Sequence, residues 1–332
     1  MGIEEVAGAL RIFVTGATGF IGRHLCRRLL DRGDEVMALV RSPAKAARLP
    51  PGTIAFPGDL SAFAAPGTEL PRCEVVIHLA GVVAARRLED YEAVNYTAVK
   101  DLIGCLARQT WRPERFLFAS SLAAGGPSSD GVARTEVDPP QPIDPYGQAK
   151  ALAEAAVREA PFPSTAFRPP IVLGPEDEAS LTLFKSARSG LGFRVAGVPQ
   201  KLSFVDVRDL VDAILLLADD RRPGAHCYYT SHPSQTDVCE LWRELGRAVG
   251  RSVWVAPVPR SALYLAMLAA TAASAVFRHT NQLDAKQYAQ MTAPAFLCSS
   301  ARLQAELGWS ARHDLPDCLA NAAAGYRAAG ML

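Results

Sequence analysis

Short apolar segments alternate with amphipathic ones through the first half of the chain. The apolar or β-branched segments have the length of buried strands in a parallel sheet. After the first of them, Ile21, Leu25 and Leu29 are spaced four apart, which predicts a helix over residues 22–31 with Gly33 as its C-cap. The other predicted elements are strands over residues 11–15, 35–40, 53–56, 75–79 and 116–119, and helices over residues 95–108 and 145–158.

This alternation predicts an α/β fold with a doubly wound parallel sheet, because each parallel strand is reached through a crossover helix. In such a sheet, ligands bind outside the carboxyl ends of the strands. The second half of the chain is less regular and has loops rich in Pro and Gly near residues 169–175 and 190–199. We therefore expect the second half to build a smaller part that covers the substrate.

Composition and charge narrow the function classes. The 332 residues are 49% hydrophobic, which supports a sizeable core, and the formal net charge of +1 provides no field that would hold a nucleic acid. A local cluster of arginines is interpreted as the solvated face of the first helix. The cluster consists of Arg23, Arg27, Arg28 and Arg32.

The cysteines and the first residues indicate an intracellular protein. The seven cysteines are scattered and include no C-x-x-C pair, so we expect reduced thiols and neither a zinc site nor a redox dithiol. Residues 1–9 lack a basic start followed by an apolar run, and no apolar run approaches the roughly 18–20 residues of a membrane span. A cytoplasmic location is predicted, with association with a membrane surface left open.

The loop after the first strand carries three regularly spaced glycines. Residues 15–22 read T-G-A-T-G-F-I-G, with Gly16, Gly19 and Gly22 in the spacing G-x-x-G-x-x-G. The first two permit a tight turn and a close approach of backbone amides to a pyrophosphate, and the third lets the helix pack near the strand. The sequence therefore predicts a dinucleotide site. Its expected contacts in this loop are Gly16, Thr18, Gly19, Phe20, Ile21 and Gly22.

The end of the second predicted strand indicates which dinucleotide is bound. An acidic residue there would bond the ribose hydroxyls of NAD, but this strand ends Val40-Arg41-Ser42. Arg41 lies 19 residues after Gly22 and is placed to pair with a 2′-phosphate. These residues favour NADP over NAD as the cofactor, with Arg41 and Ser42 as contacts.

Two further loops at strand ends are expected to line the cofactor. After the third strand, the Asp59 carboxylate is placed to bond the exocyclic amine of adenine. After the fourth, small residues let the backbone pass close to the cofactor, while His78 is given no chemical role. The expected contacts are Asp59, Leu60, Leu79, Ala80 and Gly81.

Tyr146 and Lys150 form the expected chemical centre. They are four residues apart at the start of a predicted helix and therefore share one helical face. An ammonium near a phenol is expected to lower the tyrosine pKa and make the phenol usable in acid–base catalysis near neutral pH. The same ammonium can reach ribose hydroxyls of the cofactor, so both residues are expected to contact the cofactor as well as the substrate.

Two serines and an asparagine complete the expected site. Ser120 and Ser121 end the fifth strand, so their hydroxyls are expected to point into the crevice. Ser121 is expected to bond the substrate oxygen that exchanges its proton with Tyr146, and Ser120 to lie near the nicotinamide. Asn95 is expected to hold a water that serves Lys150, with a helix-starting asparagine as the alternative.

Together these motifs resemble the extended short-chain dehydrogenase/reductases, also called the NAD-dependent epimerase/dehydratase family. The resemblance runs from T-G-A-T-G-F-I-G through D-L, H-L-A-G, S-S, Y-G-Q-A-K and R-P-P-I-V-L-G-P to F-V-D-V-R-D-L and A-E-L-G-W. It implies a Rossmann core, a bound nicotinamide, the roles given above to Ser121, Tyr146 and Lys150, and a homodimer through a four-helix contact. Within R-P-P-I-V-L-G-P, Pro169 and Ile171 are expected cofactor contacts.

The resemblance also implies that cofactor and substrate are bound by different parts of the chain. The dinucleotide-binding domain is expected over residues 9–170, completed by 202–232. The substrate-binding domain is expected over 171–201 and 233–332. The intact serine, tyrosine and lysine set favours an active enzyme over a family member retained as a scaffold or redox sensor.

Within this family, substrates are either nucleotide-sugars or ketones and alcohols on hydrophobic molecules. Nucleotide-sugar enzymes usually carry an asparagine where this chain has Pro170, and sugar dehydratases an acid where it has Leu122 and Ala123. NADP also suits net reduction. We therefore expect a ketone–alcohol oxidoreductase for a sterol-like, polycyclic or long-chain substrate, similar to the 3β-hydroxysteroid dehydrogenase-like or dihydroflavonol reductase-like branches. A nucleotide-sugar epimerase, dehydratase or reductase is the alternative.

One uncharged apolar segment, residues 261–277, lies in the second half between Arg260 and Arg278. Its apolar residues run all round a helix, so every face requires cover, yet it is too short to span a bilayer. Three interpretations stay open. The segment is a buried core helix, or it is a lining or lid for an apolar substrate and itself rests on a membrane surface, or it is a subunit contact.

Overall fold

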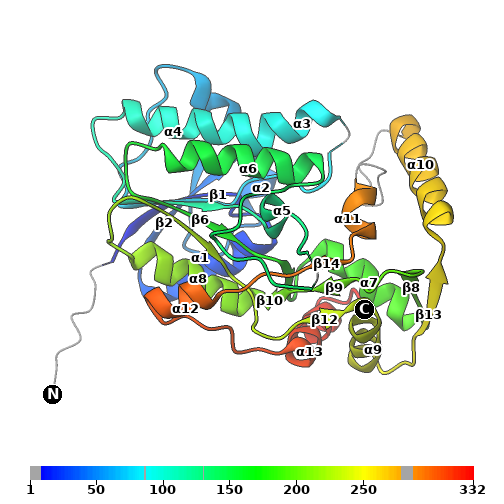
Figure 1. Ribbon diagram of the computed structural model, residues 1–332. Helices are drawn as coiled ribbons and strands as arrows, with labels where there is room; N and C mark the ends of the chain where they lie inside the picture. The colour runs from blue at the N-terminus through cyan, green and yellow to red at the C-terminus, as the bar shows by residue number, and fades with distance from the viewer. Residues whose placement is uncertain (1–8, 86, 130, 278–286) are drawn as a thin grey trace.

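A seven-stranded sheet forms the centre of the computed structural model, which describes residues 9–85, 87–129, 131–277 and 287–332 (Figure 1). Its strand order is β11-β6-β5-β4-β1-β2-β3, and every neighbouring pair is parallel. This is the predicted doubly wound sheet, with a crossover on either side of β1. Its strands are β1 (Arg11–Thr15), β2 (Glu35–Val40), β3 (Ile54–Pro57), β4 (Val75–His78), β5 (Arg115–Ala119), β6 (Ser164–Arg168) and β11 (Ala225–Tyr229).

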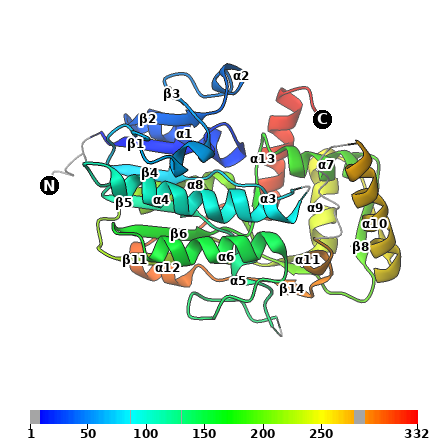
Figure 2. The same cartoon turned by 90° about the horizontal axis from the view of Figure 1, so that it is seen from above.

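Helices cover both faces of this sheet, as Figures 1 and 2 show. Side chains alternate along each strand, so Ile12 and Val14 of β1 enter one core and Phe13 enters the other. The first core is closed by α1 and α8, and the second by α4, α6 and the short helix η1. These elements are α1 (Phe20–Arg32), η1 (Leu60–Ala64), α4 (Ala98–Arg108), α6 (Pro145–Arg158) and α8 (Val207–Asp219).

The predicted strands and the first helix are confirmed to within two residues at each end, and Gly33 ends α1 in a left-handed conformation (φ +93°). The prediction of a helix starting at Asn95 is wrong. Helical structure begins earlier, in α3 (Leu88–Glu92), and passes through a π-helical turn, η2 (Ala93–Thr97), into α4. Asn95 therefore lies inside a continuous helical segment. Its side chain bonds the loop after β4 and does not cap a helix.

Most of the remaining elements gather beside the carboxyl end of the sheet (Figure 2), whereas α12 packs next to β11. There α7, α9 and α13 share a core that includes Phe184, Trp242, Leu245 and Tyr326. The strands of this part are β7 (Ile171–Leu173), β8 (Leu191–Val195), β9 (Lys201–Leu202), β10 (Phe204–Asp206), β12 (Thr236–Asp237), β13 (Trp254–Val258) and β14 (Ala295–Phe296). The other helices are α2 (Pro43–Ala46), α5 (Leu122–Gly125), α7 (Glu178–Arg188), α9 (Val238–Val249), α10 (Arg260–Phe277), α11 (Tyr288–Thr292), α12 (Ala301–Leu307) and α13 (Leu315–Ala328).

The apolar segment predicted from residues 261–277 is α10, which stands at one end of the molecule (Figures 1 and 2). Leu263 and Met267 are buried, but Leu265 is 65% exposed and Tyr264 and Leu268 are 44% and 40% exposed. The interpretation as a buried core helix is therefore wrong, because over residues 260–272, the part of α10 whose burial is described, one narrow stripe is buried and the other faces are largely exposed. Among the described residues, no helix combines the length and apolar character needed to cross a membrane.

Candidate active site

The glycine loop between β1 and α1 is packed too closely for side chains. Gly16 has φ +76°, and a Cβ there would lie 2.6 Å from the backbone nitrogen of Ala80. A Cβ on Gly22 would lie 2.2 Å from the Gly16 carbonyl oxygen. Gly19 precedes α1 and provides no side-chain cap, so the first-turn amides of α1 have no side-chain acceptor there. The loop therefore offers backbone donors at a helix N-terminus, which suits a pyrophosphate.

The predicted contacts of the loop differ in exposure. Gly19 is exposed, whereas Thr18, Phe20 and Ile21 are half-buried. Gly16 rests on the backbone of the segment after β4, as its close approach to Ala80 shows. The structure thereby brings two predicted cofactor segments, Gly16–Gly22 in the first loop and Leu79–Gly81 in the other, to the same edge of the sheet.

The ends of β2 and β3 lie next to each other, and both carry charge. Arg41 is exposed directly after β2, and Ser42 accepts a hydrogen bond from the Lys45 amide to begin α2. Asp59 accepts hydrogen bonds from the Ser61 amide at 2.7 Å and the Ser61 hydroxyl at 2.6 Å, and so begins η1 at Leu60. The Ser61 hydrogen bonds and, less strongly, the Arg41 charge lower the pKa of Asp59. Arg41 and Asp59 are thus near enough to act on one ligand.

Asn95 fixes the loop that follows β4. Its Oδ1 accepts from the Val82 amide at 3.0 Å, and its Nδ2 donates to the Val82 carbonyl at 2.9 Å. A Cβ on Gly81 would lie 2.8 Å from Asn95 Oδ1 and 3.3 Å from Lys150 Nζ. Asn95 therefore lies beside Lys150, as the sequence predicted, with its amide engaged by the loop. The water proposed to join Asn95 and Lys150 stays a prediction.

Helix α6 carries Tyr146 and Lys150 toward the end of β5. Asp144 begins the helix by accepting from the Gly147 amide at 2.7 Å. Lys150 is buried, and its ammonium donates to the Ala119 carbonyl at 2.6 Å. It also lies 4.7 Å from the ring centre of Phe118. The last residue of β5 thus holds the ammonium in place.

Ser121 lies beside the tyrosine. Its hydroxyl accepts from the Ala123 amide at 3.1 Å, which begins α5, and it lies close enough to the Tyr146 phenol to lower the pKa of that phenol. A Cβ on Gly147 would lie 2.4 Å from the Ala123 carbonyl, so the glycine after Tyr146 is what lets α5 and α6 approach. The structure therefore brings Ser121, at the start of α5, together with Tyr146 and Lys150 of α6.

Burial is the main cause of the pKa shifts of Tyr146 and Lys150. It raises the pKa of Tyr146 to about 12, although the hydrogen bond from Ser121 acts in the opposite direction. Burial also lowers the pKa of Lys150 to about 8, against the charge of Glu154. The expectation that Lys150 lowers the tyrosine pKa is not met, because the loss of water around the phenol is the larger effect.

A buried ion pair beneath the site was not anticipated from the sequence. Glu154 accepts from Arg168 Nε at 2.8 Å and Nη2 at 2.6 Å, and also from the Ser120 hydroxyl. Arg168 Nη1 donates to the Tyr229 hydroxyl at 2.9 Å. The available signal was spacing, since Glu154 follows Lys150 by four residues on the same helical face. Ser120, predicted to lie near the nicotinamide, has its hydroxyl directed to this pair.

His78 occupies the buried end of β4. Its Nδ1 is 2.8 Å from the Thr15 hydroxyl, and burial, followed by the charge of Lys150, lowers its pKa to about 3. The ring stacks on Phe118 with 6.0 Å between centres. A neutral imidazole here spaces β1, β4 and β5 at their carboxyl ends, in keeping with the absence of a predicted chemical role.

The segment after β6 closes the other side of the site. The Pro169 carbonyl accepts from the Leu122 amide at 2.9 Å, which ties this segment to the start of α5. Pro169 is buried, whereas Ile171 is 42% exposed. Val83, after β4, is 62% exposed, and Ile143, before α6, is 37% exposed. The described surroundings of the site thus include several exposed apolar side chains.

Residues 12–228 match the NAD dependent epimerase/dehydratase family. The chain belongs to this family. The glycine loop, Ser121, Tyr146 and Lys150 meet at one edge of the sheet, which agrees with membership of this family. The cofactor of the family is a nicotinamide dinucleotide. The fit of the glycine loop supports the same cofactor, because Gly16 and Gly22 leave space only for backbone.

Curated members of the family that resemble this chain have diverse names. UDP-glucose 4-epimerase from Vibrio cholerae is 28% identical over 262 residues, covering 75% of this chain and 78% of that protein. Ceramide reductase from Caulobacter vibrioides is 32% identical over 215 residues, covering 64% and 61%. Sterol demethylase protein B from Methylococcus capsulatus is 32% identical over 234 residues, covering 64% and 70%.

Solved structures show the same fold across almost the whole chain. MoeE5 in complex with UDP-glucuronic acid and NAD has a TM-score of 0.74 at 24% identity, covering 96% of this chain and 99% of that one. The Bordetella bronchiseptica enzyme WbmG in complex with NAD and UDP has a TM-score of 0.76 at 18% identity, covering 98% and 97%. At these identities the likeness establishes the fold.

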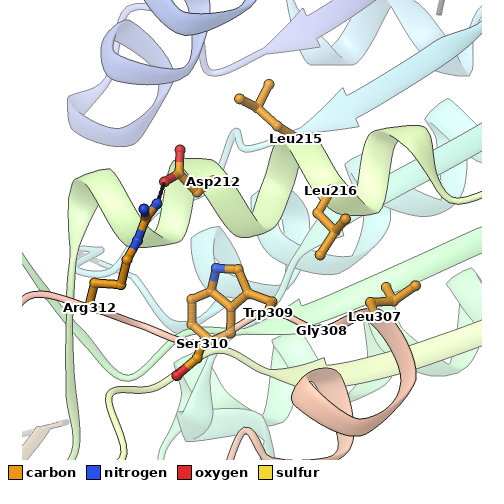
Figure 3. Close-up of a pocket in the computed structure, with 8 residues that line it drawn as sticks. All are labelled: Asp212, Leu215, Leu216, Leu307, Gly308, Trp309, Ser310 and Arg312. Atoms are coloured by element: carbon orange, nitrogen blue, oxygen red, sulfur yellow. Dashed lines mark hydrogen bonds and ion pairs between the residues drawn. The ribbon is translucent and has the colours of Figure 1, made fainter. Parts of the chain in front are cut away.

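A separate cavity of about 560 Å³ lies between α8 and the chain after α12 (Figure 3). Leu215, Leu216 and Trp309 supply much of its wall, and Arg312 pairs with Asp212 at 2.6 Å across it. Helix α8 packs on the face of the sheet opposite α6. This cavity is therefore distinct from the family site around Tyr146.

Proposed function

We propose that this protein is an NADP-dependent oxidoreductase that interconverts a ketone and a secondary alcohol on a lipophilic substrate. The observation that carries the proposal is the placement of the Ser121 and Tyr146 hydroxyls close together beside the buried Lys150, whose ammonium is held by the Ala119 carbonyl. A carbonyl oxygen placed against these two hydroxyls would accept a hydrogen bond from each. The nicotinamide, when bound, supplies or accepts the hydride at the carbonyl carbon.

The proton is carried by Tyr146. A phenol whose pKa is raised to about 12 is fully protonated at neutral pH, so it is suited to donate a proton to a developing alkoxide. Ser121 orients the same oxygen by hydrogen bonding. The protonated phenol is the form that ketone reduction requires, and alcohol oxidation requires the reverse transfer to the tyrosine oxygen.

Lys150 has the position to hold the cofactor near the tyrosine. An ammonium has three donors, of which one is given to the Ala119 carbonyl. Its Nζ lies close to Gly81, in the segment on which the glycine loop rests. We assign its remaining donors to the ribose hydroxyls of the nicotinamide nucleoside.

The preference for NADP over NAD rests on the end of β2. Arg41 is exposed there, no acidic residue follows Val40 directly, and within the described ranges Arg41 forms no ion pair. A free guanidinium can pair with the two charges of a 2′-phosphate. We assign Ser42 to the same phosphate, and Asp59 with Leu60 to the adenine.

A lipophilic substrate is supported by the absence of polar anchors on the segment after β6. Pro170 occupies the place where an asparagine is expected for a sugar diphosphate, and Ile171 next to it is exposed and apolar. Val83 and Ile143 add apolar surface nearby. The resemblance to a ceramide reductase and to sterol demethylase protein B agrees with this substrate class.

A substrate panel tests the proposal. The purified protein with NADPH is offered polycyclic ketones, long-chain ketones, UDP-sugars and dTDP-sugars, and nicotinamide absorbance is followed together with thermal stabilisation. We expect turnover with at least one lipophilic ketone and neither turnover nor stabilisation with the sugars. Stabilisation by a nucleotide-sugar alone contradicts the proposed substrate class.

The second candidate is a nucleotide-sugar epimerase, dehydratase or reductase. It is favoured by the UDP-glucose 4-epimerase from Vibrio cholerae, which aligns with 75% of this chain, more than the ceramide reductase does. An epimerase returns its hydride to the same substrate, so it would show no net change in nicotinamide absorbance. Interconversion of two UDP-sugars with constant absorbance would identify this activity.

We also propose a homodimer and a division into two domains. The dimer would form through α4 and α6, where Leu152 is 49% exposed on the surface of α6. The cofactor domain would comprise residues 9–170 and 202–232, and the substrate domain residues 171–201 and 233–332. Sedimentation equilibrium of the purified chain and of a Leu152→Glu variant measures the subunit number.

A further inference from the structure

Helix α10 presents apolar side chains to solvent. Tyr264, Leu265 and Leu268 are exposed, while Leu263 and Met267 fasten the helix to β8 and β13 through Val195, Val198 and Val258. From Ser261 to Phe277 the helix contains no charged residue. A contiguous exposed apolar face of this kind marks a contact with a membrane or another molecule.

The strands that precede α10 expose two further apolar side chains. Trp254 of β13 is 66% exposed and Leu191 of β8 is 54% exposed, and the two are direct partners in the parallel pair. Paired residues point to the same face of a sheet, so the two side chains lie together. Figure 1 shows β13 running into α10 at one end of the molecule. We call Leu191, Trp254, Tyr264, Leu265 and Leu268 the end patch.

Two arginines lie near residues of the end patch in the chain. Arg251 precedes β13 and Arg260 begins α10, whereas Arg247 pairs with Glu244. Arg251 and Arg260 are both exposed, and neither has an ion-pair partner among the described residues. Arginines that flank an apolar surface extend their guanidinium groups toward lipid phosphates, while their aliphatic carbons pack on the apolar surface.

The end patch is connected to the active site. Helix α11, which packs on α10 through Tyr264 and Tyr288 with ring centres 5.1 Å apart, is preceded by Gln287. Gln287 Nε2 donates to the Val83 carbonyl at 3.3 Å. Val83 belongs to the segment after β4 that Asn95 holds beside Lys150. The end patch is therefore linked to the segment after β4 through α11.

The geometry points to the surface of an anionic phospholipid bilayer as the occupant of the end patch, with α10 lying in the interface. Apolar residues would enter the acyl boundary, Trp254 and Tyr264 would lie at headgroup level, and Arg251 and Arg260 would meet phosphates. A second copy of this chain fits less well, because a two-fold contact would bring the arginines of both patches together without an acid. This inference concerns docking and does not depend on the substrate.

Vesicle binding of the intact chain tests the inference. The probes are vesicles of phosphatidylcholine alone and of phosphatidylcholine with phosphatidylglycerol at roughly 7:3. We expect sedimentation with the mixed vesicles, weakened by salt, and much weaker sedimentation with phosphatidylcholine alone. Leu265→Glu with Leu268→Glu should reduce binding about tenfold or more, because two charges enter the acyl boundary. Arg251→Gln with Arg260→Gln should reduce it by roughly fivefold per arginine.

A matched control places the same charges elsewhere. Ile54 and Val137 are 50% and 88% exposed, far from α10 in the chain, so Ile54→Glu with Val137→Glu should bind vesicles as the unaltered chain does. Equal vesicle binding by the control and the α10 variant would overturn the inference, as would no binding by the unaltered chain. An α10 variant that turns a lipid-free dimer into a monomer would assign the end patch to a second copy instead. Because no turnover is measured, failure here leaves the proposed reaction standing.

Discussion

Tyr146 retains its proton because burial outweighs its polar contacts. The prediction at this residue is that Tyr146→Phe lowers the single-turnover rate of reduction by roughly 10²–10⁴-fold, the usual contribution of a general acid. Lys150 and the glycine loop remain, so NADPH should still bind, with a much smaller change in affinity than in rate. Stopped-flow absorbance measures the chemical step and fluorescence titration measures cofactor binding. A variant that keeps most of the rate would remove Tyr146 from the chemistry.

Lys150 predicts a pH dependence. Its pKa is lowered from 10.5 to about 8, so the ammonium is present below pH 8 and is lost as the pH rises through that value. Because kcat/KM reports groups of the free enzyme, kcat/KM for reduction should fall above about pH 8. Lys150→Met has no ammonium at any pH, so its kcat/KM should be low and should not fall further above pH 8. A fall in kcat/KM above pH 8 that persists in Lys150→Met would assign this pH dependence to another group.

Arg41 predicts the cofactor preference. Arg41→Gln should weaken NADPH binding about tenfold or more, since a charge-assisted hydrogen bond contributes about 1.5–3 kcal/mol, and should leave NADH binding unchanged. Arg72→Gln is the control, because Arg72 is exposed before β4, at the amino edge of the sheet. Titration of both cofactors against the three proteins gives the comparison. Tighter binding of NADH than NADPH by the unaltered chain would contradict the preference.

At the scale of elements, the Glu154–Arg168 pair joins α6 to β6 beneath the site. Glu154→Gln leaves the Arg168 guanidinium buried without its carboxylate, so unfolding by urea should show a loss of about 3–5 kcal/mol. Glu159→Gln, on the exposed end of the same helix, should change stability by much less. A loss in Glu154→Gln no larger than in Glu159→Gln would mean that the pair does not couple these elements.

The same pair explains why two adjacent serines differ. Ser120 and Ser121 both follow β5, but alternation along an extended backbone sends one hydroxyl down to Glu154 and the other toward Tyr146. The sequence supported the choice of Ser121 for the substrate side and could not show what Ser120 contacts. That answer required the position of α6, which brings Glu154 under β5.

At the scale of the whole molecule, three crossovers deliver their loops to one edge. The glycine loop, the segment after β4 and the start of α5 all follow parallel strands, whose carboxyl ends necessarily meet. Helix α10 stands apart from this edge and is linked to it through α11 and Gln287. The arrangement links the edge that carries the candidate active site to a surface formed by the second half of the chain.

The sequence by itself determined the parallel sheet, the dinucleotide loop and the shared helical face of Tyr146 and Lys150. Each depends on local periodicity or on glycine, whose effect on the backbone does not need distant partners. The tertiary structure alone decided the raised pKa of Tyr146, the Glu154–Arg168 pair and the exposure of α10. Burial is a sum over neighbours from many parts of the chain, so an apolar helix reads the same in sequence whether the fold covers it or leaves it facing solvent.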